Sequence, residues 1–126
     1  MRFARFILLL GVTASSSLMS DQIGFSKQIQ PIFAQHCTKC HGHDKPKAGL
    51  NMTLRAGVLG KLKSGERAVV PGQPEKSEIL RRLTSDDPDE MMPPPEKGER
   101  LSATQIKLLR QWISDGAEWE VHWAYR

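Results

Sequence analysis

The sequence predicts an all-α fold in which a few helices are joined by long loops. Apolar residues recur at helical spacing in three segments, residues 29–40, 74–83 and 102–113. Most prolines and glycines fall in the connections between these segments, where they favour turns. A chain of 126 residues is long enough for one domain and too short for a second sizeable core. We therefore expect a single small helical domain.

The first predicted helix leads to a cysteine pair. Pro31 fits its first turn, where a missing N–H costs nothing, and Gly42 is expected to end it. One helical face, at positions i, i+3, i+4, i+7, i+8 and i+11, collects Ile29, Ile32, Phe33, His36, Cys37 and Cys40. The helix is thus expected to carry the cysteines at its C-terminal end.

The most informative motif in the chain is Cys37-Thr38-Lys39-Cys40-His41. A C-x-x-C-H pattern is typical of covalent c-type haem attachment. On a helix the two thiols and the imidazole project from one face within about one turn, so the sulfurs reach one edge of a porphyrin while the imidazole lies under the iron. We therefore predict thioethers at Cys37 and Cys40 and proximal iron ligation by His41. The second ring nitrogen of His41 is expected to donate to a carbonyl.

Three other interpretations of this motif remain open. Zinc could be bound by Cys37, Cys40, His41 and His43, although no second cysteine pair follows downstream. A thioredoxin-like dithiol would be expected next to a strand, and the preceding residues lack strand-like alternation. A plain disulfide would need neither the histidine nor its position.

The middle of the chain is less strongly patterned. Residues 45–49 indicate a loop. Residues 68–70 form a short segment that could lie extended over a cofactor. Pro74 is predicted to begin a helix of about two turns. A short helix or irregular segment is expected to turn one apolar side inward with Leu50, Leu54, Val58, Leu59 and Leu62. In the helix after Pro74 we expect Ile79, Leu80 and Leu83 inward, and Glu75, Lys76, Glu78 and Arg81 outward.

A methionine followed by three prolines is the second functional candidate. Met92 lies 51 residues after His41 and precedes Pro93, Pro94 and Pro95. Prolines have a fixed φ and push the preceding residue to an extended conformation, so this segment is a stiff strap. A stiff strap presents a thioether to iron with little conformational entropy left to lose. We predict Met92 as the distal haem ligand, with rivals at Met91, Met52, His43 and His122.

The last helix is the clearest one in the chain. Ser102 followed by Gln105 forms a capping box, and Gly116 supplies the C-terminal stop. Its inward stripe consists of Ile106, Leu109, Trp112 and Ile113. An aromatic tail follows, with Trp119, His122, Trp123 and Tyr125, and is expected to pack the chain end or to form an interface.

The first 20 residues have the pattern of a secretory signal peptide. Arg2 and Arg5 precede an apolar run over residues 6–12, and small residues at 13–17 suit signal-peptidase cleavage. The run is far shorter than the ~20 residues that span a bilayer, so no stable membrane insertion is expected after signal removal. We expect a signal peptide over residues 1–20 and an exported, periplasmic or otherwise extracytoplasmic domain over residues 21–126.

The charge of the chain gives no support for nucleic-acid binding. The formal net charge is +4, and the first 20 residues hold two arginines and no acidic residue, so +2 remains without them. No basic patch interleaved with aromatic residues is present in the sequence. Nucleic acid is therefore not an expected partner.

The ordered set of motifs resembles the planctomycete-type cytochrome c domain. The similar positions are Phe25, Ile29, Pro31 and Ile32; residues 37–42, 47–50, 70–72, 74–77 and 92–94; Leu101, Ile106, Trp112, Ile113, Gly116 and Ala117; and residues 122–125. The resemblance implies a cytochrome c-like helical fold around one covalently bound haem c. In it Cys37 and Cys40 carry the haem, and His41 is the proximal ligand. Met92 corresponds to the methionine before the proline pair.

Two positions depart from the family pattern. Ala48 stands where the family often has glycine, and the acidic residue that the family has near Thr53 is missing. Neither position is a proposed ligand, so the departures concern loop packing.

The function expected from these observations is one-electron transfer. A mono-haem c-type cytochrome with His/Met ligation cycles its iron between Fe(III) and Fe(II), and the chain is then an electron carrier and not an enzyme. Its partner would be a redox protein or a larger domain, with Lys39, Lys45 and Lys47 available to steer an acidic surface. The alternatives are an N-terminal redox or docking module of a larger exported enzyme, an enzymatic or sensing haem protein in which a small molecule displaces the methionine from the iron, and a zinc-binding module.

Overall fold

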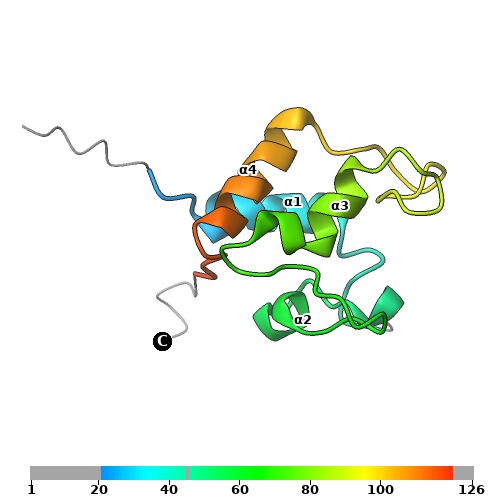
Figure 1. The fold of residues 1–126 in the computed structure, drawn as a ribbon, viewed down its shortest axis with the longest axis horizontal. Coiled ribbons are helices and arrows are strands. Elements are labelled where there is room, and N and C mark those ends of the chain that lie inside the picture. Colours follow the sequence, from blue (N-terminus) through cyan, green and yellow to red (C-terminus); the bar gives the residue numbers. More distant parts are fainter. Residues whose placement is uncertain (1–20, 45, 121–126) are drawn as a thin grey trace, which may run out of the picture.

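The computed structural model describes residues 21–44 and 46–120, which form a helical fold (Figure 1). In chain order the elements are the π-helical turn η1 (Phe25–Ile29), α1 (Gln30–His36), the 3-10 turn η2 (Lys47–Gly49), α2 (Arg55–Leu59), the 3-10 turn η3 (Pro74–Lys76), α3 (Glu78–Thr84) and α4 (Ala103–Ser114). Within these ranges there is no β-strand, only an isolated antiparallel bridge between Lys61 and Arg67. The predicted all-α class is confirmed.

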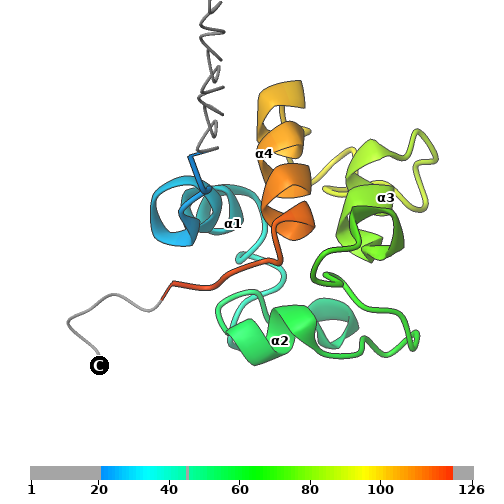
Figure 2. The ribbon, with the colours of Figure 1, turned by 60° about the vertical axis from the view of Figure 1, so that its left-hand side comes forward.

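Helix α4 lies between α1 and α3, and α2 lies apart from these three helices (Figures 1 and 2). On one side α4 contacts η1, the turn that leads into α1, and on the other side it contacts α3 and η3. The first and last helical segments therefore pack together. None of the helices in the described ranges is long and apolar enough to cross a membrane.

Four aromatic rings form the centre of the contact between η1, α1 and α4. The rings of Phe25 and Trp119 are stacked, with centroids 3.8 Å apart, and Trp112 lies 5.6 Å from Phe25. Phe33 of α1 meets Trp112 edge-on at 5.9 Å. Aromatic pairs in these geometries add stabilisation beyond the burial of their area. Trp119 of the predicted aromatic tail thus packs the chain end, whereas residues 122, 123 and 125 lie outside the described residues.

The two ends of α4 have the caps that the sequence predicts. At the N-terminal end the Ser102 hydroxyl accepts a hydrogen bond from the amide of Gln105, whose side chain accepts one from the amide of Ser102. At the C-terminal end Gly116 has φ +107°, a left-handed conformation that favours glycine. Its amide and that of Ala117 donate to carbonyls of the last turn, those of Ile113 and Trp112, which is a Schellman motif.

The first helix begins earlier and ends earlier than the spacing predicts. The π-helical turn η1 precedes it, and Pro31 lies in the first turn of α1. The helix ends at His36 instead of continuing to Gly42, because the Phe33 carbonyl accepts the amides of both Cys37 and Thr38 and closes the last turn. The cysteines therefore lie in the turn that follows α1.

The helix predicted from Pro74 is divided in two at Ser77. This buried residue has an extended conformation between η3 and α3. Its hydroxyl accepts a hydrogen bond from the amide of Val70 and donates one to the carbonyl of Gln73. Ser77 thereby ties the extended segment that contains buried Val69 to the start of α3.

Candidate functional site

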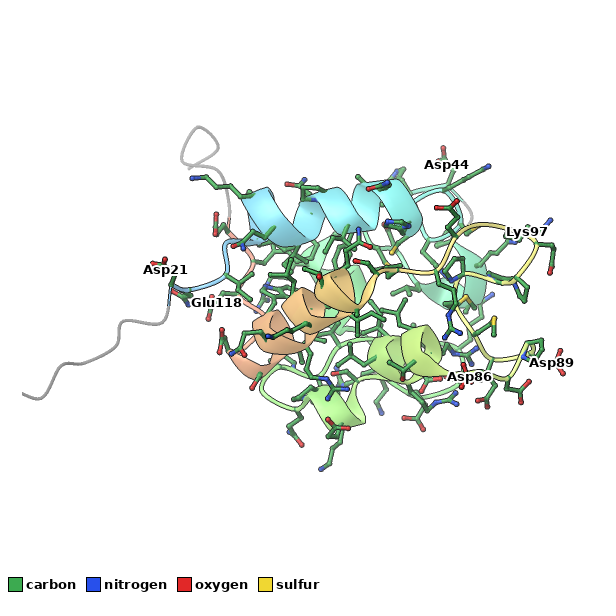
Figure 3. The ribbon with its side chains drawn as sticks, turned by 90° about the horizontal axis from the view of Figure 1, so that it is seen from above. Asp21, Asp44, Asp86, Asp89, Lys97 and Glu118 are labelled. Atoms are coloured by element: carbon green, nitrogen blue, oxygen red, sulfur yellow. The ribbon has the colours of Figure 1, made fainter. Side chains whose placement is uncertain are left out.

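A cavity of about 430 Å³ lies among α1, α3 and the loops, within the size range of about 300–1,000 Å³ of small-molecule sites. Its lining combines sulfur and imidazole donors with apolar side chains, among them Cys37, Cys40, His41, Leu50, Met52, Leu62, Ala68, Ile79, Leu83, Met92 and Pro93. Charged side chains that line it are Lys39, Glu78, Arg82, Lys97 and Glu99. Lys97, one of the lining residues, lies at the opposite end of the molecule from Asp21 and Glu118 (Figure 3).

The turn after α1 brings the residues of the C-x-x-C-H motif to this cavity. The carbonyl of Cys37 accepts the amide of Cys40 at 3.2 Å and that of His41 at 2.9 Å, so the motif folds as a single helical turn. Both cysteines are half-buried free thiols, and both line the cavity together with His41. The predicted continuous helix is wrong here, but one isolated turn still gathers the three side chains.

The imidazole of His41 is fixed by a backbone carbonyl. Its Nδ1 lies 3.1 Å from the carbonyl oxygen of Lys47, and the carbonyl of His41 accepts the amide of Met52 at 2.8 Å. Burial lowers the pKa of His41, and the nearby charges of Lys47 and Arg82 act in the same direction, although the hydrogen bond to the Lys47 carbonyl opposes them. A neutral imidazole with its proton on Nδ1 keeps a lone pair on Nε2, as a metal ligand requires.

The thiol of Cys37 does not have the properties of a redox-active dithiol. Burial raises the pKa of Cys37 to about 12, so the thiol is protonated at neutral pH. Disulfide oxidoreductases depend on the opposite shift, a lowered pKa that yields a thiolate. Among residues 21–44 and 46–120 no group of three or more His, Cys, Asp or Glu residues is arranged to hold a metal ion, so the alternative zinc set with His43 is not assembled.

The methionine strap contributes Met92 and not Met91 to the lining of the cavity. Met92 is half-buried, and its amide donates to the carbonyl of Arg82 in α3 at 3.1 Å. Met91 is bonded to the preceding loop through the carbonyl of Asp87. Met52 also lines the cavity, but its amide is bonded to His41 itself. Of the other rivals, His43 is exposed and outside the lining, and His122 lies outside the described residues.

Two charged residues of α3 lie in the cavity wall, which the sequence did not indicate. Glu78, expected to point outward, is only 12% exposed and accepts hydrogen bonds from Arg81 and Arg82. These bonds, that from Arg81 first, lower the pKa of Glu78 although burial opposes them. The available signal was the spacing, because Glu78 and Arg82 at i and i+4 share a helix face that Ile79 and Leu83 flank.

The donors at this cavity suit a c-type haem. The cavity offers two thiols on one turn, an imidazole held by a carbonyl, and a thioether from a distant segment. Together with the apolar lining, these groups fit a flat apolar macrocycle with a central iron. A helical domain with this donor set has the features expected of a c-type cytochrome.

Comparison with known families agrees with this class. Residues 37–96 match the family model described as planctomycete cytochrome C, and this match supports the resemblance seen in the sequence. The match begins at Cys37 and includes the strap, and the family implies haem c and electron transfer. Searches of curated proteins and of solved structures find no significant match to this chain.

Proposed function

We propose that the protein is a mono-haem c-type cytochrome that carries single electrons. In this proposal Cys37 and Cys40 hold the haem through thioethers, and His41 and Met92 are its axial ligands. The supporting observation is that these four side chains line one cavity, although 51 residues separate His41 from Met92. When bound, haem c supplies an iron that cycles between Fe(III) and Fe(II).

His41 is the proximal ligand in this proposal. The hydrogen bond between Nδ1 and the Lys47 carbonyl fixes the tautomer and the ring orientation, and such a bond raises the basicity of the ligating nitrogen. The amide of Lys47 in turn donates to the carbonyl of Cys40, so the attachment turn and the loop that orients His41 hold each other.

Met92 is the distal ligand in this proposal because it comes from a different wall than His41. Its amide is bonded to α3, whereas Met52 is bonded to the carbonyl of His41 and so belongs to the proximal wall. A thioether is a soft ligand that favours the reduced iron and raises the potential. With His41 and Met92 in place both axial positions are filled, which supports an electron carrier over an enzyme.

The partner is proposed to be a redox protein or domain with an acidic surface. Residues 39–67 carry seven lysines and arginines and only two acids, Asp44 and Glu66. Within the described part of the chain, every ion pair lies among residues 75–110, so the six described bases of residues 39–67 form none, and Lys45 lies outside the described residues. Lys39 lines the cavity, which brings this basic region to the proposed haem site.

The protein is proposed to act outside the cytoplasm. Cytochrome c domains are typically extracytoplasmic. The sequence supports export through residues 1–20, which resemble a signal peptide and lie outside the described residues.

A spectroelectrochemical titration tests the function. Protein exported from a host that matures c-type cytochromes should titrate reversibly as one site with a one-electron Nernst slope. A preparation that retains haem but shows no reversible one-electron couple would contradict the role as a carrier.

A further inference from the structure

A network of charge-assisted hydrogen bonds on α3 lies next to the strap. The carboxylate of Glu78 accepts bonds from Arg81 Nε at 2.9 Å and a terminal nitrogen of Arg81 at 2.6 Å, and from Arg82 Nε at 2.9 Å. Bonds between ionised partners are shorter and about twice as strong as neutral ones. Glu78 therefore holds both arginine side chains in defined positions.

Both arginines also bond the loop just before Met92. Arg81 forms an ion pair with the carboxylate of Glu90 at 2.7 Å, and Arg82 donates to the main-chain carbonyl of Glu90 at 3.3 Å. The main-chain carbonyl of Arg82 accepts the amide of Met92 at 3.1 Å. The network thus connects α3 to the strap at residues 90 and 92.

Two members of this network, Glu78 and Arg82, belong to the cavity wall, whereas the side chains of Arg81 and Glu90 are more exposed and lie outside its lining. Glu78 and Arg82 line the same cavity as Met92, with side chains 12% and 33% exposed. The ion pair between Arg110 and Glu75 offers a contrast, because its side chains are 42% and 80% exposed and neither lines the cavity. Partly buried pairs are less screened by solvent than exposed ones and contribute more.

We propose that Glu78 and Arg82 are positioning residues that hold Met92 at the axial position. The inference rests on the proposed ligation by Met92. Residues 86–89 before the strap are exposed, so little apolar burial holds this part of the loop. The strap exchanges between a state in which the thioether is at the iron and a released state, and bonds made only in the first state shift the equilibrium toward it. Glu78 orients Arg82, and Arg82 holds the segment that ends at Met92.

Binding of imidazole to the ferric holoprotein measures this equilibrium. Imidazole competes with the thioether for the iron, and because it is neutral, a change of local charge affects its binding little. We expect Arg82→Gln to raise the apparent affinity for imidazole by about tenfold, the factor that loss of one charge-assisted hydrogen bond gives. Glu78→Gln should raise it several-fold, and Arg82→Lys should restore part of the difference from the wild type.

Arg110→Gln is the matched control, because it removes an arginine from an ion pair remote from the cavity. It should leave the imidazole affinity within about twofold of the wild type, as exposed pairs contribute little. Equal affinities for Arg82→Gln, Glu78→Gln and Arg110→Gln would overturn the proposal. If Arg82→Gln does not mature, Glu78→Gln decides the question alone.

Met92→Ala separates this inference from the proposed function. If Met92 is the ligand, this variant loses the iron-sulfur absorption band and binds imidazole most tightly of all. If it keeps the band, the proposed ligation fails, and the positioning role fails with it. If it loses the band while the variants at Arg82 and Glu78 match the control, only the positioning role fails.

Discussion

The two walls of the cavity are held together in different ways. Around His41 the chain is fixed by its own backbone: amides and carbonyls of residues 37–52 bond one another, and the imidazole bonds one of these carbonyls. Around Met92 the strap is fixed mainly by charged side chains of α3, through Glu78, Arg81 and Arg82, besides one main-chain bond. Arg100, which follows the strap, donates to the carbonyls of Leu83 and Ser85 at the C-terminal end of α3.

This difference predicts unequal behaviour of the two proposed axial ligands. Hydrogen bonds within a short stretch of backbone do not depend on ionisation or on salt. Ion pairs, in contrast, weaken when one partner loses its charge and when the salt concentration rises. The wall around His41 should therefore remain formed under conditions that loosen the wall around Met92. We therefore expect the proximal ligand His41 to stay on the iron under conditions that release the distal ligand Met92.

The largest expected effect concerns the attachment residues. Replacing Cys37 and Cys40 together by serine should abolish retention of haem after denaturation and organic extraction, because no thioether can form. Extraction followed by absorption spectroscopy of the polypeptide measures this. His43→Ala is the control, since His43 lies in the adjoining loop outside the cavity lining, and it should retain haem fully. Retention by the double variant would show that the wall around His41 is not the attachment site.

The next effect distinguishes the methionines. Met92→Ala should eliminate the long-wavelength band of ferric iron bound to a thioether and lower the reduction potential, because a soft ligand that favours Fe(II) is lost. Met91→Ala and Met52→Leu are the controls and should keep the band. Loss of the band in Met52→Leu alone would place both ligands on the wall around His41 and remove the contrast between the walls.

The pH dependence of stability should sharpen the contrast. The pKa of Glu78 is lowered in the folded state, so the unfolded state takes up its proton first and the stabilisation by Glu78 is lost as the pH falls through the folded pKa. At pH 7 we expect Glu78→Gln to cost about 1.5–3 kcal/mol, the range for hydrogen bonds to charged groups. Denaturant unfolding of both proteins should show this difference shrinking as the pH falls below the ordinary pKa of a glutamate and vanishing below the lowered pKa of Glu78. A difference independent of pH would mean that the ionised carboxylate does not support this wall.

Salt should act on one wall only. Raising ionic strength from 0.1 to 1 M shortens the Debye length from about 10 to about 3 Å, so the pairs around Glu78 weaken. We expect the imidazole affinity of the ferric protein to rise a few-fold in the wild type and less in Arg82→Gln. An identical rise in both would show that salt acts elsewhere.

The smallest effect follows from the unequal charge of the two walls. Residues 39–67 contain seven basic and two acidic residues, whereas residues 75–100 contain five basic and eight acidic ones. If electrons leave beside the wall around His41, oxidation by ferricyanide should slow several-fold as salt rises, whereas a cationic cobalt complex should not slow. Replacing Lys39 and Lys47 by glutamine should reduce the salt effect on ferricyanide. A cationic oxidant favoured at low salt would place the exit at the acidic side.

Features that depend on hydrogen bonds between residues close in the sequence could be predicted from the sequence. The capping box of α4, its end at Gly116 and the carbonyl partner of His41 were all anticipated. Each depends on residues within a few positions of one another, or on the general chemistry of a ligating imidazole. The donor residues of the candidate site were predicted on the same basis, as a short motif and a Met-Pro strap.

Elements that depend on distant contacts were not predicted. The helix after Pro74 is divided because the hydroxyl of Ser77 bonds the amide of Val70 on another segment. Helical spacing puts Glu78 on the same face of α3 as Arg82, but contacts across the fold decide that this face meets the strap and lines the cavity. The sequence also could not separate Met92 from Met91, because the bond to Arg82 that distinguishes Met92 spans ten residues.

The absorption spectrum of the matured protein tests the central claim most directly. It should be recorded oxidised and reduced on protein exported in a host that matures c-type cytochromes, and again after denaturation and organic extraction. The account predicts that haem stays with the polypeptide and that the ferric native form shows the iron-sulfur band. Haem that is extracted, or a polypeptide that holds none, would contradict covalent attachment at Cys37 and Cys40 and with it the proposed electron transfer.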